Sequence, residues 1–188
     1  MEEEAMTTVA AHRLEQVEAP GAMLTKAAAK TLAVLRVATG FVFLWAFLDK
    51  TFGFGYATPS AKAWINGGSP TKGFLSSVEA GPFKGLFHSL AGNPVADWAF
   101  MLGLLGIGLA LILGIGLRVA AGSAIAMMAL MWAAEWPLAS GSSNPVVDYH
   151  VIYAITAVVL ALTYAGHTWG LGRLWARLPL VQKNRWLI

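Results

Sequence analysis

Four apolar segments separated by polar stretches dominate the chain. They cover residues 31–48, 98–117, 119–134 and 149–167. Each is close to the roughly 20 residues that a helix needs to cross about 30 Å of hydrocarbon. Only helices and closed barrels satisfy their backbone groups in lipid, and none of these segments alternates like a barrel strand. The pattern therefore predicts an all-α membrane protein, a bundle of four transmembrane helices that lies in the lipid bilayer.

The composition is consistent with this pattern. Of the 188 residues, 57% are hydrophobic and only 12% are charged, which is about half the charged fraction of soluble domains. We predict one membrane domain over residues 27–188 and a mobile cytoplasmic segment over residues 1–26. The opening residues lack the basic start and apolar core of a cleavable signal peptide, so the first span is expected to act as an uncleaved signal.

The basic residues predict an orientation. They precede the first span, occupy the turn between the second and third, and follow the fourth: Arg13, Lys26, Lys30, Arg118, Arg173, Arg177, Lys183 and Arg185. The protein is expected to be a multi-pass protein of the inner (plasma) membrane. The positive-inside rule then places both of its termini in the cytoplasm. Residues 50–95 form a long outer loop, expected either to cover the outer face as a lid or to pack at the interface. Tryptophans and arginines after the fourth span predict a short interfacial helix ending near Pro179.

One carboxylate marks the outer end of each span: Asp49, Asp97, Glu135 and Asp148. Such groups are costly at a hydrocarbon boundary unless they are hydrated, paired or protonated. Asp97 and Asp148 fall at helix N-termini, where a carboxylate can cap free N–H groups. Asp49 and Glu135 fall at C-termini, where the helix dipole disfavours them. These two therefore need another reason, such as a proton relay or a substrate contact.

Residues beside Asp148 suggest quinone chemistry. Tyr149, His150 and Tyr153 lie within about a turn of it on the fourth span. A carboxylate, an imidazole and phenols can donate to a quinone carbonyl and move its protons, although an interfacial histidine can also be merely solvated. Trp45, near the outer end of the first span, is expected to be a further contact of the quinone.

Arg36 is the one charge inside the first span. It is expected either to snorkel to the inner headgroups or to contact an anion or a quinone headgroup. It cannot pair with Asp49, which lies roughly 20 Å further along the same helix. Lys62, Lys72 and Lys84 of the outer loop could attract an anionic substrate.

Several classes of site are not expected. The chain has no cysteine, which excludes disulfides, iron–sulfur clusters and thiol nucleophiles. Haem is not expected, because His150 and His167 share one helix and lie about 25 Å apart along it. No metal site is evident. The basic residues are dispersed and do not form the clustered stripe of a nucleic-acid-binding surface.

Four segments resemble the DoxX/DoxD family: LRVATGFVFLWAFLDK, WINGGSPTKGFL, GNPVADWAFMLGLLGIGLALILGIGLR and NPVVDYHVIYAITAVVLALTYAGHTWGLGR. The resemblance runs from about residue 32 to the C-terminus and looks closest to large subunits of bacterial thiosulfate:quinone oxidoreductase. It implies oxidation of thiosulfate to tetrathionate outside, delivery of electrons to menaquinone or ubiquinone, and a small second subunit. Without a resident redox centre, the chain would pass electrons directly to quinone or use a centre in a redox partner protein.

Two other functions remain open. The chain could be a non-catalytic scaffold or accessory subunit of a redox or stress-response complex, or a small lipid or solute carrier. A carrier should contain a continuous cavity with Arg36 lining its inner half, whereas a scaffold should have a packed interior. Assembly into an oligomer is also left open.

Overall fold

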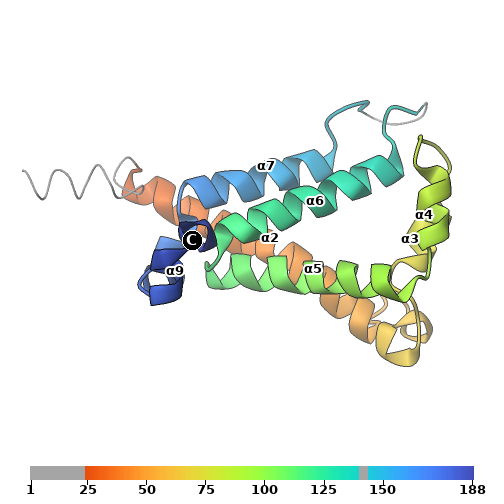
Figure 1. Ribbon diagram of the computed structural model, residues 1–188, viewed down its shortest axis with the longest axis horizontal. Helices are drawn as coiled ribbons and strands as arrows, with labels where there is room; N and C mark the ends of the chain where they lie inside the picture. The colour runs from red at the N-terminus through yellow and green to blue at the C-terminus, as the bar shows by residue number, and fades with distance from the viewer. Residues whose placement is uncertain (1–23, 140–143) are drawn as a thin grey trace, which may run out of the picture.

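The computed structural model describes residues 24–139 and 144–188, and helices form without β-strands throughout this part of the chain. Four helices exceed the rest in length: α2 (Lys26–Phe52), α5 (Pro94–Leu113), α6 (Leu117–Glu135) and α7 (Tyr149–Leu162). They pack side by side, with α2 against α5, α5 against α6 and α6 against α7 (Figure 1). The prediction of an all-α protein is confirmed. The prediction for residues 1–26 lies almost entirely outside the described residues.

The helices α2, α5 and α6 are long and apolar enough to cross a membrane. At most 33% of the most apolar stretch of each is buried inside the protein. Their exposed surface is therefore largely hydrophobic, as is a row on α7 formed by Ile152, Ile155, Val159 and Leu162. A water-soluble fold rarely leaves such continuous apolar faces uncovered. The chain is therefore a membrane protein.

Local chemistry sets helix ends that the apolar pattern misplaced. The α5 helix begins at Pro94, since Asn93 caps it by accepting from the N–H groups of Val95 and Ala96. It ends before Gly114, which adopts the left-handed conformation with φ 73°, so the predicted span 98–117 starts and ends too late. The α7 helix stops at Leu162 and not at residue 167, with Tyr164 left-handed just beyond it.

The loop between α2 and α5 is folded. It contains two 3₁₀ turns, η1 (Ser60–Lys62) and η2 (Trp64–Asn66), followed by α3 (Lys72–Ser76) and α4 (Lys84–Leu90). Figure 1 shows α3 and α4 lying across one end of the bundle. Val78 and Phe87 are buried there against Ala134, near the end of α6. This packing favours the expectation that the loop covers the end of the bundle.

The C-terminal segment differs from the single interfacial helix predicted. Beyond η3 (Ala165–His167) it forms α8 (Gly172–Trp175), α9 (Pro179–Lys183) and η4 (Arg185–Leu187). Pro179 begins α9 and does not end a helix, because proline has no N–H and its fixed φ suits the first helical position. The Trp175 indole N–H donates to the Leu187 carbonyl at 2.6 Å, and the Arg118 N–H donates to Ile188 at 2.9 Å.

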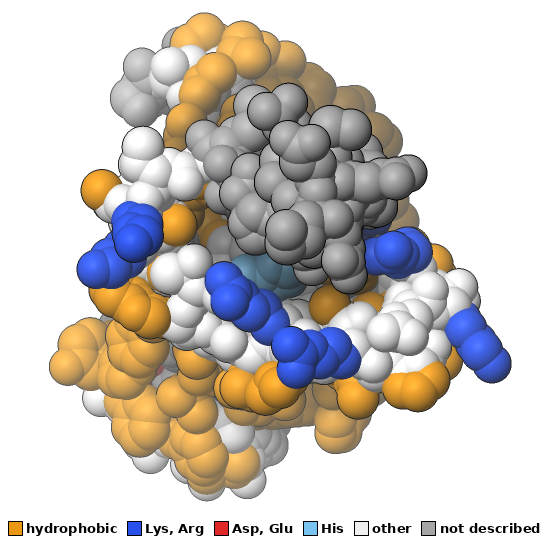
Figure 2. Space-filling view, turned by 90° about the vertical axis from the view of Figure 1, so that its left-hand side faces the viewer, with side chains coloured by type: hydrophobic (Ala, Val, Ile, Leu, Met, Phe, Trp, Pro, Cys, Tyr) orange, Lys and Arg blue, Asp and Glu red, His pale blue; other side chains and the backbone are white. Residues whose placement is uncertain are grey.

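The two ends of the bundle differ in charge. The end where α8 and α9 lie, the basic end, carries exposed Lys and Arg side chains, which form an arc across the middle of the view in Figure 2. They belong to the start of α2, the start of α6 and the C-terminal segment: Lys26, Lys30, Arg118, Arg173, Arg177, Lys183 and Arg185. All five carboxylates of the described residues belong to the opposite, acidic end: Asp49, Glu79, Asp97, Glu135 and Asp148.

Candidate functional site

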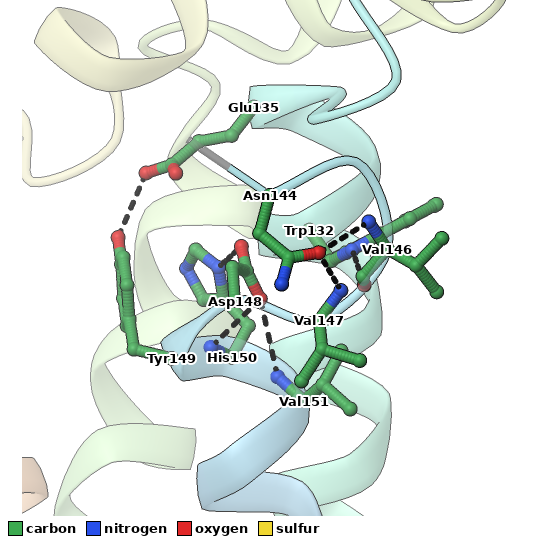
Figure 3. A network of polar contacts seen from close by, with 9 residues as sticks. All are labelled: Trp132, Glu135, Asn144, Val146, Val147, Asp148, Tyr149, His150 and Val151. Carbon is green, nitrogen blue, oxygen red and sulfur yellow. Dashed lines mark hydrogen bonds and ion pairs between the residues drawn. The ribbon is translucent and has the colours of Figure 1, made fainter. Parts of the chain in front are cut away.

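The start of α7 is organised by Asp148. This residue caps the helix, because its Oδ1 accepts from the N–H groups of His150 at 3.0 Å and Val151 at 3.2 Å. The other oxygen, Oδ2, lies 2.8 Å from Nδ1 of the His150 ring (Figure 3). His150 is 0% exposed, and its Nε2 has no hydrogen-bond partner within the described chain. The predicted capping role of Asp148 is confirmed, and the same carboxylate also orients a buried imidazole.

The end of α6 contributes the second half of this site. The Tyr149 hydroxyl donates to Oε1 of Glu135 at 2.8 Å, and the Tyr149 and His150 ring centres lie 4.0 Å apart. The turn before α7 is tied to α6 by Trp132, whose indole N–H donates to the Val146 carbonyl at 3.0 Å. Figure 3 shows the imidazole between the Asp148 carboxylate and the Tyr149–Glu135 pair. We call these four residues, Glu135, Asp148, Tyr149 and His150, the end cluster.

An open cavity of about 490 Å³ adjoins the end cluster. Glu135, Asp148 and Tyr149 line one side of it. The α3 helix and the residues after it line the other, with apolar surface from Phe74 and Val78. A planar, half-apolar ligand that enters this cavity would therefore meet the Tyr149 hydroxyl and three carboxylates, those of Glu79, Glu135 and Asp148.

Hydrogen bonds set the charge state of Asp148. Partial burial raises the pKa of this carboxyl, but the bonds from the His150 ring and from the N–H groups of Val151 and His150 outweigh burial and lower the pKa below its ordinary value of 3.8. Asp148 is therefore ionised at neutral pH. An ionised carboxylate only accepts hydrogen bonds, so Nδ1 of His150 donates to it. In the neutral ring, Nε2 then carries an unused lone pair.

This lowered pKa predicts a pH dependence of stability. The stabilisation by ionised Asp148 is complete above the unfolded pKa of about 3.9 and is lost as the pH falls through the lower folded pKa. We expect the wild type to lose more thermal stability than Asp148→Asn between pH 5 and about pH 3. Melting temperatures of both proteins in detergent, recorded at several pH values, would measure this difference. Equal losses in the two proteins would contradict it.

Asp49 and Asp97 hold loops at the acidic end. The Asp49 carboxylate is 2% exposed and accepts from the N–H groups of Ala57 at 3.0 Å and Thr58 at 2.8 Å. Oδ1 of Asp97 accepts from the N–H of Thr71 at 3.0 Å and from its hydroxyl at 2.6 Å. The predicted cap at Asp97 is wrong, because Asn93 takes that role. Neither carboxylate lines the cavity, so the structure gives both a loop-anchoring position.

Arg36 is placed differently from both expectations. It is 0% exposed, so it does not snorkel. Its Nε donates to Ala165, Nη1 to Leu111 and Ile112, and Nη2 to Thr168 and Trp169, all at backbone carbonyls. These bonds use all five guanidinium N–H groups. No donor remains for an anion or a quinone headgroup, and Arg36 instead joins the end of α5 to η3 and the two residues that follow it.

The other predicted ligand contacts do not converge on the cavity. Trp45 packs against Phe54 and Tyr56 of the loop after α2, and Tyr153 packs edge-on against Phe43. Neither belongs to the cavity lining, and neither do the three exposed lysines of the loop, Lys62, Lys72 and Lys84. The structure thus brings together five of the predicted residues, namely the end cluster and Tyr153, whose ring packs edge-on against Tyr149 with 6.2 Å between the ring centres.

Sequence reasoning missed the residues that face the end cluster across the cavity. Phe74, Val78 and Glu79 lie in the predicted outer loop and carry no motif of their own. The aromatic spacing of the loop was a signal that it folds, but it does not reveal which helix end it meets. Comparison of this chain with protein-family models, curated proteins and solved structures found no match. The functional case therefore rests on the chemistry of the end cluster.

Proposed function

We propose that the chain crosses the bacterial inner membrane four times, with the basic end in the cytoplasm and the acidic end outside. The charge segregation supports this orientation under the positive-inside rule. The α7 helix is only 14 residues long, but its outward apolar row and the turn to residue 167 support a fourth span. Both termini would then be cytoplasmic, and the cavity would open at the outer membrane surface.

We propose that the cavity binds a quinone headgroup and exchanges its protons, which makes the chain a subunit of a quinone-linked membrane oxidoreductase. The observation that carries this proposal is the end cluster itself, four titratable side chains at the end of an apolar bundle. A menaquinone or ubiquinone suits the apolar lining from Phe74 and Val78, and its ring needs donors such as the Tyr149 hydroxyl.

The end cluster supplies a proton route with the residues in distinct roles. Tyr149 would give its proton to a quinone carbonyl and take one back from Glu135 after solvent in the open cavity has protonated that carboxylate; the two side chains are hydrogen-bonded at 2.8 Å. The second proton would come from solvent in the cavity beside Asp148, whose Oδ2 the buried His150 holds through Nδ1 at 2.8 Å. Reduction of a quinone consumes two electrons and two protons, and the cavity is open for exchange of both protons with solvent.

The electron donor is proposed from the resemblance to the DoxX/DoxD family. Oxidation of two thiosulfate ions to tetrathionate releases the two electrons that the quinone consumes. The loop lysines Lys62, Lys72 and Lys84 are exposed at the acidic end, where they would draw anions towards a membrane surface. A small second subunit or another redox partner protein would complete the donor site.

A non-catalytic scaffold or accessory subunit is the second candidate. The packed inner half of the bundle favours it over a carrier, since Arg36, Leu111 and Leu160 are all 0% exposed. Arg36 does not line a transport path there, because all of its N–H groups donate to backbone carbonyls. A scaffold would keep its partner complexes after the end cluster is altered, whereas an oxidoreductase subunit would lose turnover.

Quinone reduction by purified protein tests the proposed function. Thiosulfate-dependent reduction of a soluble quinone analogue should fall roughly 100-fold in Tyr149→Phe and Glu135→Gln, in the range expected for a lost proton-transfer group. Lys183→Gln is the control, because Lys183 is exposed at the basic end, away from the cavity. Absence of both quinone binding and reduction in the wild type, assayed with any co-purifying subunit, would refute the proposal.

A further inference from the structure

We propose that the basic end binds the headgroup of an anionic phospholipid through Arg118, Arg173 and Arg185, beside an apolar row on the C-terminal segment. Arg118 lies in the first turn of α6, whereas the other two arginines belong to α8 and η4. All three side chains are exposed. This site requires a membrane surface at the basic end, and it depends neither on the quinone reaction nor on which side of the membrane that end faces.

The cations of the basic end have no carboxylate partners in the described chain. All five carboxylates of the described residues lie at the opposite end of the bundle. The one ion pair within residues 24–139 and 144–188 joins His150 to Asp148. Unpaired positive charge gathered on one face attracts anions. Basic clusters directly beside membrane-spanning helices are typical of proteins that bind anionic lipids.

Arg118 is held in position for such a ligand. Its Nη1 donates to the Arg185 carbonyl at 3.1 Å and its Nη2 donates to the Tyr164 hydroxyl at 2.7 Å. The guanidinium also lies over the Tyr164 ring, 5.6 Å from the ring centre. These bonds use two of the five guanidinium N–H groups, so three remain for a phosphate. Because the side chain is already fixed, binding costs it little further conformational entropy.

The contacts of Arg118 bring a second cation to the same place. The backbone N–H of Arg118 donates to the Ile188 carbonyl at 2.9 Å, and the Arg185 carbonyl accepts from its side chain. The Arg185 side chain itself extends from this contact and is exposed. Like charges on two touching segments repel one another. A phosphate that both guanidinium groups contact would offset this repulsion.

Apolar side chains beside the cations indicate that the phosphate belongs to a lipid. The Trp175 N–H donates to the Leu171 carbonyl at 2.9 Å, and the Leu178 N–H donates to the Trp175 carbonyl at 3.1 Å, so the turn of α8 extends over both leucines. Leu171, Leu174 and Leu178 therefore share one face, and they are 46%, 62% and 45% exposed. Arg173 lies beside this face, and Figure 2 shows hydrophobic side chains next to the arc of cations. A phospholipid would contact the leucines and the arginines together.

Lipid retention by the full-length protein in detergent tests the site. The protein is incubated with equal amounts of phosphatidylglycerol and phosphatidylcholine that carry the same acyl chains, and bound lipid is counted by native mass spectrometry. The wild type should retain phosphatidylglycerol in preference by roughly tenfold or more, since each cation near an anionic headgroup contributes about fivefold. The preference should decrease as the salt concentration rises, because salt screens exposed charges.

Arg173→Gln combined with Arg185→Gln should lower the preference by roughly fivefold or more. Arg118→Lys should lower it about threefold, because lysine keeps the charge but not the paired N–H groups of the guanidinium. Lys62→Gln combined with Lys72→Gln is the matched control, since it removes two exposed cations from the opposite end. The control should change the preference by less than about twofold. Thermal unfolding of each variant in detergent checks that the fold is kept.

The leucine row is tested separately from the cations. Leu174→Asn combined with Leu178→Asn should lower retention of phosphatidylglycerol roughly threefold, which a site for free phosphate would not show. Equal retention of the two lipids by the wild type would overturn the proposal. So would equal losses in the arginine and lysine variants, or full retention by the leucine variant. The assay contains no quinone and no thiosulfate, so its failure is distinguishable from failure of the quinone proposal.

Discussion

Replacing Arg36 with methionine should unfold the protein at a temperature lower by roughly 10 °C or more. The substitution keeps an unbranched apolar stem but removes the donors to five backbone carbonyls of α5, η3 and the turn that follows. Each buried acceptor left unpaired costs about 1–3 kcal/mol, so a loss of at least about 4 kcal/mol is expected. In a domain of this size, each kcal/mol corresponds to about 2–4 °C.

Arg177→Met is the matched control, since Arg177 is exposed on the C-terminal segment. It should change stability by no more than about 0.5 kcal/mol. Arg36→Lys should be intermediate or worse, because lysine offers three donors at a single point and cannot span carbonyls from two helix ends. Thermal unfolding in detergent measures all three variants. An Arg36→Met protein as stable as Arg177→Met would show that the guanidinium does not hold these helix ends together.

The glycines around Arg36 explain how so large a group fits between helix ends. A Cβ on Gly166 would stand 2.2 Å from the Gly114 carbonyl oxygen, and one on Gly170 would stand 3.0 Å from Nη2 of Arg36. Small residues therefore let the backbone close around the guanidinium. The positive charge also meets the carbonyl ends of α5 and the turn after α7, where the helix dipole is negative.

The sequence predicted the apolar helices well because membrane spans are set by length and hydrophobicity. It also predicted that Glu135 and Asp148 share an end of the bundle, since antiparallel neighbours return to the same face. The sequence did not predict which groups are the hydrogen-bond partners of the buried charges. Nothing in the pattern around Arg36 indicates that carbonyls 75 to 133 residues away would take up its donors.

Helix caps show the same limit on a smaller scale. Asp97 looked like the start of the second span because it borders the apolar run. Asn93 and Pro94 start the helix one turn earlier, since together they satisfy the first N–H groups and remove one. Asp97 is thereby free to bind Thr71, a loop contact 26 residues away. Such contacts depend on the path of the loop, which hydrophobic periodicity does not describe.

Asp49, Asp97 and Glu135, three of the five acids at the acidic end, should separate into two groups when each is replaced by alanine. Asp49→Ala and Asp97→Ala should each lower the free energy of unfolding by about 3 kcal/mol, because each substitution leaves buried donors without an acceptor. Glu135→Ala should cost less than about 1 kcal/mol, since Glu135 is exposed and accepts one bond from Tyr149. Unfolding in detergent, read by near-ultraviolet circular dichroism, would measure these differences.

Limited proteolysis should locate the damage within each variant. Loss of the Asp49 carboxylate frees the N–H groups of residues 56–58, and loss of the Asp97 carboxylate frees Ser69 and Thr71. Cleavage should therefore rise near residue 57 in Asp49→Ala and near residue 70 in Asp97→Ala, and at neither place in Glu135→Ala. A Glu135→Ala protein that is the least stable of the three, with both loops still protected in the aspartate variants, would reverse the division. Glu135 would then have a structural role, and the case for proton transfer by Glu135 in the cavity would fail.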